Sequence, residues 1–393
     1  MTKRFLVINV GSSSIRFQVL DMPDCKVLLK GRISDIGQSK GLFEYSGEAN
    51  SKKKETVDDI TQALGMVLGL MVKLDIHDLD CIVHRVMHGG PNHTYPVIMS
   101  NRLLKSLEPI QEMEPIQNPK ALLVIKECME VFFHSPNVAV FDTEFHSTID
   151  QKNYTIPLPK MFLENGAIRK YGFHGISHEY LVKKTSLMLK KNKKSARKII
   201  TVHAGNDISV CATQDGISIN TSMGFTPLTG PIMGTRTGDI DVGVLEYISR
   251  KEGLAFPDIY NLINTHGGLY GLTHHSDIRK VKKDAAKGNQ SCAVALEMCT
   301  LQIARLIAGY VCDLDGVDAI VFSGGIGEEA SWFRQLICNN LRWIGLKLSK
   351  RENEKNCEGI ISTTASSCTA MMLHTDEERM MAEKAYELLE NSI

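Results

Sequence analysis

Two stretches of the 393-residue chain decide its fold: Phe5-Leu-Val-Ile-Asn-Val-Gly11 near the start and Ile199-Ile-Thr-Val-His-Ala-Gly205 near the middle. Each is an apolar run of strand length that ends at a glycine, which predicts a buried strand followed by a tight turn. The alternating run Ile15-Arg-Phe-Gln-Val-Leu20 follows the first as its hairpin partner, and Ile208-Ser-Val-Cys-Ala-Thr213 follows the second. The repeat predicts an internal duplication, with two related α/β domains facing each other across a phosphate-binding cleft.

The rest of the chain fits this α/β pattern. Gln214-Asp-Gly216 leads into Ile217-Ser-Ile-Asn220, which is typical of a hairpin turn and its second strand. Periodicity predicts further strands at 80–83, 138–141 and 318–322, and helices at 120–133, 178–189, 291–312 and 376–389.

Composition excludes several classes of function. Lys and Arg total 45 and Asp and Glu total 45, so no excess of charge attracts the chain to nucleic acid. Residues 190–198 are strongly basic, but no aromatic residue interleaves them, which favours a solvated interdomain loop over a nucleic-acid patch. No apolar stretch approaches the roughly 20 residues that cross a bilayer, and Asn9 interrupts the only early apolar run. The ten cysteines form no CxxC pair, which predicts free thiols in a reducing cytoplasm.

Four segments carry candidate phosphate-binding groups. Asn9-Val-Gly-Ser-Ser-Ser14 with Arg16 offers a glycine bend, hydroxyls and a cation, although ordinary turn chemistry explains it about equally well. Arg85 follows a predicted strand, where such sheets present ligand groups, or it forms a surface ion pair. Asp142 ends another strand and could hold a metal ion, orient a phosphoryl group or cap a turn. Arg236 lies among small residues, so its guanidinium could approach a compact anion closely.

Three other segments have competing interpretations. His174 lies in Tyr171-Gly-Phe-His-Gly-Ile-Ser-His178, whose spacing is unlike a zinc site, and it either binds a phosphoryl group or is structural. Ser323-Gly-Gly-Ile-Gly-Glu-Glu329 fits a glycine turn beside adenosine better than a dinucleotide fingerprint. Thr375 and Glu378 have the spacing of a capping box, which explains Glu378 and leaves Glu377 to reach a metal.

Taken together, these motifs resemble the acetate kinase family across nearly the whole chain and in family order. The matching segments are Asn9–Ser14, His84-Arg85 with His88–Gly90, Phe141–Thr143, Tyr171–Gly175, Met233–Arg236, Gly324–Glu328 and Thr375–Glu378. The resemblance implies a duplicated two-domain actin-like (ribonuclease H-like) α/β fold with an active-site cleft between the domains. The expected domains are residues 1–150, completed by the C-terminal helix 375–393, and residues 151–374, which carry the nucleotide site and a dimerisation surface.

The resemblance also implies roles for individual residues. Arg85 and Arg236 would bind the transferred phosphoryl group, His174 would donate a hydrogen bond to it, and Asp142 and Glu377 would organise Mg²⁺, or Mn²⁺ in its place. Asn9, Ser12, Ser14 and Arg16 would lie around the metal and phosphates. The nucleotide would meet His203, Asn206, Asp277, Arg279, Gly325 and Ile326, and the alkyl group of the acid would meet Met87, Ile116, Phe173 and Pro227.

This chain departs from the family pattern at four positions. Arg16 replaces a lysine, Gln117 replaces a histidine, Asp207 replaces a glycine in the phosphate loop and Glu329 replaces an asparagine. Asp207 would oppose the phosphates of ATP unless it points away or binds metal.

The expected activity is therefore reversible transfer of the ATP γ-phosphoryl group to acetate by a cytoplasmic homodimer that binds neither nucleic acid nor membrane. Met87 fills a position that often carries a smaller residue, so acetate is expected over propionate, and propionate over butyrate. The alternatives are a kinase of propionate or another short acid, a kinase that uses pyrophosphate, and a non-catalytic nucleotide-binding regulator.

Overall fold

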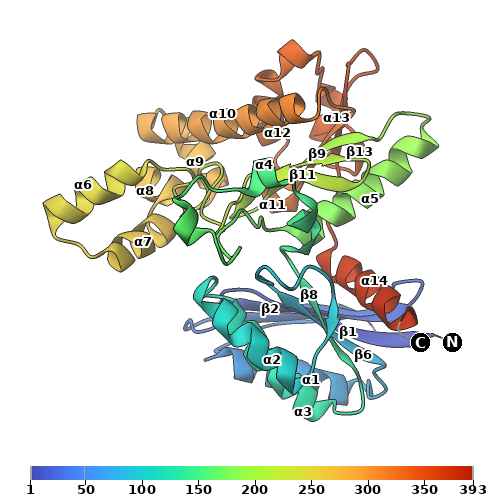
Figure 1. Ribbon diagram of the computed structural model, residues 1–393. Helices are drawn as coiled ribbons and strands as arrows, with labels where there is room; N and C mark the ends of the chain where they lie inside the picture. Colours follow the sequence, from blue (N-terminus) through green and yellow to red (C-terminus); the bar gives the residue numbers. More distant parts are fainter. Residues whose placement is uncertain (1, 48, 392–393) are drawn as a thin grey trace. The chain divides into compact units, whose positions relative to one another are not determined.

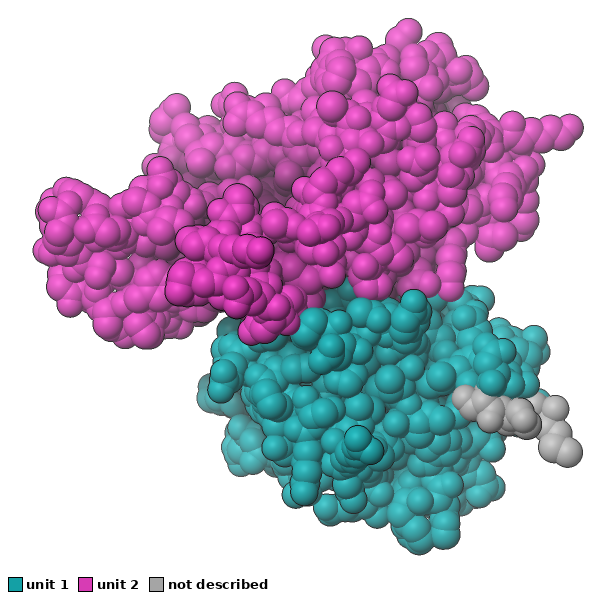
Figure 2. Space-filling view, in the orientation of Figure 1, with its two compact units in different colours: residues 1–144, 376–393 teal, residues 145–375 magenta. Residues whose placement is uncertain are grey.

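The computed structural model describes residues 2–47 and 49–391. The chain forms two compact units, which Figure 2 colours separately. Unit 1 consists of Met1–Glu144 and Asp376–Ile393, and unit 2 of Phe145–Thr375. The C-terminal helix thus returns to the unit in which the chain begins.

Unit 1 is built on an eight-stranded sheet in the order β5-β4-β3-β2-β1-β6-β8-β7. Its strands are β1 (Lys3–Val10), β2 (Ser14–Met22), β3 (Lys26–Ser34), β4 (Gly41–Gly47), β5 (Ser51–Glu55), β6 (Cys81–Val86), β7 (Val97–Ile98) and β8 (Asn137–Phe141). Its helices are α1 (Ile60–Lys73), α2 (Asn101–Leu107), α3 (Asn118–Val131) and α14 (Glu377–Glu390) (Figure 1).

Helices cover both faces of this sheet because β1 is apolar on both sides. Successive side chains of a strand point to opposite faces. Leu6 and Ile8 pack into the core formed with α1 and α3, whereas the ring of Phe5 lies 6.2 Å from the ring of Tyr386 in α14. Burial on both faces explains the continuous apolar run Phe5–Ile8 within β1.

Unit 2 contains a six-stranded sheet in the order β11-β10-β9-β12-β14-β13. Its strands are β9 (Lys198–Ala204), β10 (Ile208–Gln214), β11 (Ile217–Thr221), β12 (Ala319–Ser323), β13 (Gly359–Ile360) and β14 (Thr369–Met372). Its helices are α4 (Gln151–Tyr154), α5 (Gly175–Lys191), α6 (Val242–Glu252), α7 (Phe256–Thr265), α8 (Gly268–Thr273), α9 (Ile278–Ala285), α10 (Gln290–Asp313), α11 (Gly324–Glu329), α12 (Ser331–Asn339) and α13 (Lys350–Glu354).

The two sheets confirm the internal duplication. In unit 1, β3, β2 and β1 pair antiparallel, and β1, β6 and β8 continue as parallel neighbours. In unit 2, β11, β10 and β9 repeat the antiparallel part, and β9, β12 and β14 repeat the parallel part. The predicted hairpin turn is also present, because Asp215 and Gly216 both have positive φ, at 52° and 87°.

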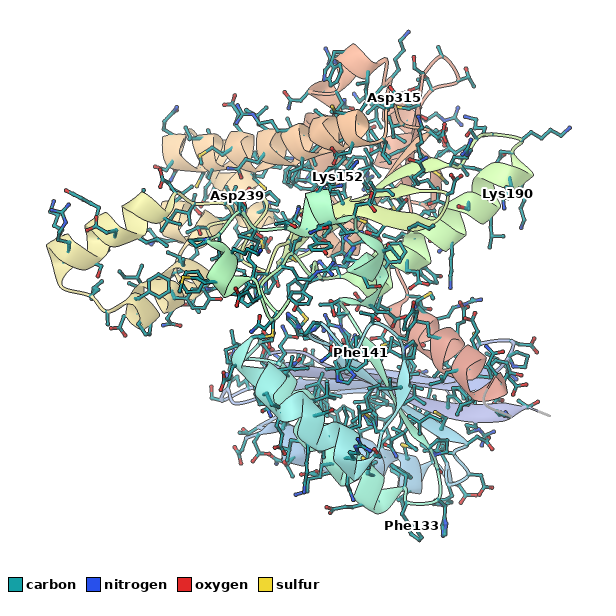
Figure 3. All side chains as sticks on the ribbon, in the orientation of Figure 1. Phe133, Phe141, Lys152, Lys190, Asp239 and Asp315 are labelled. Carbon is teal, nitrogen blue, oxygen red and sulfur yellow. The ribbon has the colours of Figure 1, made fainter. Side chains whose placement is uncertain are left out.

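Several details of the sequence interpretation were wrong. The basic run 190–198 lies inside unit 2, from the last turn of α5 to the first residue of β9, so it is not interdomain, although residues 190–195 are exposed as expected (Figure 3 labels Lys190). Helix α10 is long and apolar enough to cross a membrane by length and composition, contrary to the expectation that no stretch approaches this length. It packs against α8, α9, α12 and β10 within unit 2.

The capping box was also misassigned. The N-cap of α14 is Asp376, whose side chain accepts a hydrogen bond from the backbone N–H of Arg379, and not Thr375. Glu378 is therefore not explained by capping. Its side chain instead accepts a hydrogen bond from Asn9.

Candidate active site

A buried ion pair lies at the ends of two parallel strands of unit 1. Arg85 lies within β6, which continues past the predicted end of this strand, and Asp142 directly follows β8 (Figure 3 labels the preceding Phe141). Arg85 Nη2 donates to Asp142 Oδ2 at 2.9 Å, and the two side chains are 10% and 0% exposed. Burial lowers the pKa of Arg85, but Asp142, Glu377 and Glu114 raise it, and the net shift is upward. Arg85 therefore stays charged in a poorly hydrated place.

The other groups around Arg85 leave one of its donors available. Nη2 also lies 3.1 Å from the sulfur of Met87, and Nη1 donates to Gln117 Oε1 at 3.4 Å. Nε is buried and makes no hydrogen bond within residues 2–47 and 49–391. Buried donors are almost always paired in native proteins, so this N–H makes Arg85 a candidate anion-binding group.

Two carboxylates meet beside the first strand. Asn9, at the end of β1, donates from Nδ2 to Glu377 Oε2 at 3.2 Å and to Glu378 Oε1 at 3.0 Å. Burial raises the pKa of Glu378, and the charge of Glu377 raises it further, whereas Arg16 and Asn9 act in the opposite direction. Arg16 pairs with Asn9 in the register of β2 against β1. The sequence analysis missed Glu378 as part of this group because capping appeared to account for it.

Unit 2 places two histidines together near the start of α5. His174 precedes the helix with a left-handed φ of 58°, and its ring lies 4.3 Å from the ring of His203 at the end of β9. His174 Nδ1 contacts Ser209 Oγ at 2.8 Å, and His203 Nδ1 contacts Ser177 Oγ at 2.8 Å. These hydroxyls fix the ring orientations. Sequence reasoning overlooked both serines, because only the strand register brings Ser209 opposite His203.

The loop at residues 203–207, which is expected to bind phosphate, contacts the segment that carries Arg236. Gly234 N donates to Asn206 O at 3.0 Å, and a Cβ at Gly234 would lie 2.3 Å from Asn206 Oδ1, so a larger residue there would displace the side chain of Asn206. Arg236 Nη1 lies 2.9 Å from Asp207 Oδ2, and the side chains are 12% and 29% exposed. The carboxylate of Asp207 therefore faces Arg236, whose positive charge compensates its own.

The predicted adenosine residues lie around α9 and α11. Asp277 caps α9, and Arg279 Nη1 donates to Glu329 Oε2 at 3.1 Å, so Glu329 has a cationic partner. The glycine-rich segment after β12 forms the short helix α11 and not a turn, which corrects the sequence interpretation. Gly325 remains open, because a Cβ there would meet no atom within 4 Å in the described part of the chain.

The remaining predicted residues are distributed over both units. Ser12 is exposed, and Ser14 begins β2. Of the residues expected around the alkyl group, Met87 and Phe173 are buried, Pro227 is also buried, and Ile116 is 45% exposed. Met87 and Ile116 belong to unit 1, whereas Phe173 and Pro227 belong to unit 2.

One further polar centre escaped the sequence analysis. Glu328, in α11, accepts hydrogen bonds from Ser323 Oγ and Gly324 N, both at 3.0 Å. Its other oxygen lies 2.6 Å from His374 Nδ1. Glu328 therefore ties α11 to the segment that precedes α14.

Comparison with known proteins agrees with this geometry, since residues 4–383 match the acetokinase family. The chain belongs to this family. It is 40% identical to an acetate kinase of Thermotoga maritima, over 98% of this chain and 99% of that protein, and 38% identical to one from Carboxydothermus hydrogenoformans, over 99% and 100%. The family and the enzyme class, a phosphotransferase with a carboxyl acceptor, are as the sequence predicted.

Solved structures match along nearly the whole chain. A propionate kinase from Francisella tularensis superposes with a TM-score of 0.91 at 33% identity and covers 97% of this chain and 98% of that one. An acetate kinase from Porphyromonas gingivalis superposes with a TM-score of 0.87 at 28% identity, over 98% and 100%. The expected α/β two-domain actin-like fold is confirmed.

Proposed function

We propose that this protein transfers the γ-phosphoryl group of ATP reversibly to acetate, giving acetyl phosphate and ADP. The observation that carries the proposal is Arg85: a buried cation with an unpartnered Nε among the described residues, next to the apolar side chain of Met87. A small carboxylic acid offers both a carboxylate and a methyl group, which match these two neighbours. The names of the relatives favour the same acceptor.

The chemistry needs charge neutralisation and positioning more than proton transfer. A carboxylate is already deprotonated at neutral pH, so no general base is required. Arg85 and Arg236 would bind the oxygens of the phosphoryl group in flight, and His174 would donate a hydrogen bond to it. Preorganised cations and donors of this kind are the main catalytic devices in phosphoryl transfer.

The residues beside β1 fit a magnesium ion. Within residues 2–47 and 49–391, no group of three or more His, Cys, Asp or Glu could hold a metal alone. Mg²⁺ usually takes only one or two carboxylates and completes its shell with water and substrate phosphates. Glu377 and Asn9 would supply such a shared site together with Asp142, which like Glu377 acts on the charge of Arg85, and Glu378 adds a further carboxylate. The ion, or Mn²⁺ in its place, would neutralise charge on the phosphates.

The donor we favour is ATP. Asp207 faces Arg236, so its charge is compensated, and the open surface at Gly325 leaves room for a nucleoside. His203 and Asn206 would contact the nucleotide phosphates, with Asp277, Arg279 and Ile326 nearer the adenosine. Pyrophosphate is the second donor to test, because it needs none of the adenosine residues.

Propionate is the second acceptor to consider, because a propionate kinase superposes closely on this chain. We favour acetate because Met87 is long and its sulfur contacts Arg85, which leaves less room for an added methylene. We further propose that the protein acts as a cytoplasmic homodimer. The cytoplasmic location agrees with its ten free thiols.

The deciding assay traps acyl phosphate with hydroxylamine, with acetate, propionate or butyrate as acceptor and MgATP or magnesium pyrophosphate as donor. Acetyl hydroxamate formed from MgATP is the expected result. Signal only with pyrophosphate would show that pyrophosphate, and not ATP, is the donor. Signal only with propionate would show that propionate, and not acetate, is the acceptor. Folded protein that is silent with every pair would indicate a nucleotide-binding regulator.

A further inference from the structure

A buried chain of hydrogen bonds runs from the centre of the unit 2 sheet to His174. Thr201 Oγ1, in β9, lies 2.6 Å from His178 Nδ1. His178 Nε2 lies 2.8 Å from Ser209 Oγ in β10, and the same oxygen lies 2.8 Å from His174 Nδ1. Thr201, His178 and Ser209 are all fully buried, so water does not interrupt the chain.

The direction of the chain follows from counting protons. His178 is neutral, because burial, with the nearby charges of His146 and His203, lowers its pKa well below the ordinary value. It therefore carries one ring proton, on Nε2 or on Nδ1. The position of this proton decides which way each hydroxyl must point.

Only one direction satisfies every buried donor. With the proton on Nε2, Thr201 donates to His178 Nδ1, His178 donates to Ser209, and Ser209 donates to His174 Nδ1. With the proton on Nδ1, the Thr201 hydroxyl must accept, and its own hydrogen has no other partner in the described part of the chain. Buried hydroxyl donors without an acceptor are rare, which selects the first direction.

We propose that Thr201, His178 and Ser209 are positioning residues that set the tautomer of His174. Because Ser209 donates to Nδ1, this nitrogen is an acceptor, and the ring proton of His174 is placed on Nε2. His174 then presents an N–H donor from Nε2, which is what a hydrogen bond to phosphoryl oxygen requires. The inference deepens the proposed function and rests on it for the role of His174, whereas the tautomer itself is independent of any activity.

The first test reads the tautomer directly. In protein labelled with ¹⁵N-histidine, two-bond ¹H–¹⁵N spectra distinguish protonated from bare ring nitrogens, and the His174→Gln spectrum identifies the signals of His174 by their loss. The expected result is a bare Nδ1 and a protonated Nε2. A protonated Nδ1 in neutral His174 would overturn the proposal.

The second test removes the donor at the start of the chain. Thr201→Val deletes its hydroxyl with little change in volume, and Thr213→Val is the matched control, since Thr213 is an equally buried threonine of the same sheet whose hydroxyl donates to Ile199 O at 3.0 Å. Thr201→Val is expected to let His174 populate both tautomers and to lower kcat about three- to tenfold with KM little changed. Thr213→Val is expected to change neither.

The outcomes separate the two proposals. Equal spectra and equal kcat for the two valine variants would refute the positioning chain. If Thr201→Val fails to fold, the spectrum of the unaltered protein still decides the tautomer. An unaltered protein that has the expected tautomer but forms no acyl phosphate would refute the proposed function and leave the chain in place.

Discussion

The ion pair between Asp207 and Arg236 should weaken nucleotide binding, and Asp207→Asn should relieve this effect. Arg236 Nη1 lies 2.9 Å from Asp207 Oδ2, so Arg236 must leave this partner, or share it, when it binds phosphoryl oxygens. The amide of asparagine keeps the shape of the side chain and removes its charge. The KM for MgATP is therefore expected to fall.

The size of the effect follows from the exposure of the pair. Two unit charges 4 Å apart attract by about 4 kcal/mol at an effective dielectric constant of 20. Asp207 is 29% exposed, so water screens the pair toward the ~0.2 to 1 kcal/mol of exposed ion pairs. A value of about 1 kcal/mol corresponds to roughly a fivefold change in KM.

The assay is acyl hydroxamate formation at varied MgATP and saturating acetate, at low and at high salt. Asp215→Asn is the control, because Asp215 pairs with Arg197 at 2.7 Å at an exposed position far along the hairpin from the phosphate loop. Asp215→Asn should leave the KM for MgATP unchanged. High salt should reduce the difference in this KM between Asp207→Asn and the unaltered protein. An unchanged KM would refute the competition, and a raised KM with a lower kcat would mean that Asp207 holds Arg236 in its productive position.

Three further predictions address the site and the fold. Arg236→Ala should lower kcat by about 10² to 10³ with little change in the thermal midpoint, and unchanged turnover would remove its assigned role. For the acceptor, kcat/KM should fall from acetate to propionate to butyrate, by about tenfold for each methylene. Met87→Ala should reduce the differences in kcat/KM between the three acids. A reversed order of the acids would contradict the role of Met87. Burial lowers the pKa of His84 to about 4, below the ordinary 6.5, so the unfolded chain binds a proton that the folded protein excludes. The free energy of unfolding should then fall as pH falls from about 6.5 to 4, by about 1.4 kcal/mol per pH unit for His84. When urea titrations are repeated across this pH range, the unfolding free energy of His84→Gln should change less with pH than that of the unaltered protein. An equal change with pH in the two proteins would refute the assignment.

The strands that begin each half were predictable because burial on both faces leaves a simple signal. Residues 5–8 are apolar throughout and residues 199–205 are mostly apolar, and the structure places β1 and β9 at these positions in the centres of the two sheets. The hairpin after β10 was equally visible, because Asp-Gly is one of the dipeptides favoured in a turn with two positive φ values. These signals are local, and a single sequence contains them.

The partners of the site residues were not predictable, because they depend on contacts between distant segments. Nothing in the sequence near Asp207 indicates that its carboxylate reaches Arg236, which comes from a separate loop. Ser209 lies close to His178 because of strand register and helix packing, neither of which local periodicity fixes. The start of α14 was misassigned for a related reason, since Thr375 and Asp376 are both good caps and only the backbone geometry distinguishes them.

The path of the chain also bears on how the protein folds as it is synthesised. Unit 2 is one continuous segment, Phe145–Thr375, whereas unit 1 needs α14, whose residues Met380, Met381 and Ala385 are buried. Residues 2–144 leave the ribosome before this helix, so the apolar face around Phe5 that it covers has no partner until residues 377–390 have been made. Unit 2 can therefore fold as one continuous segment, whereas unit 1, most of which is made before unit 2, is completed only after it.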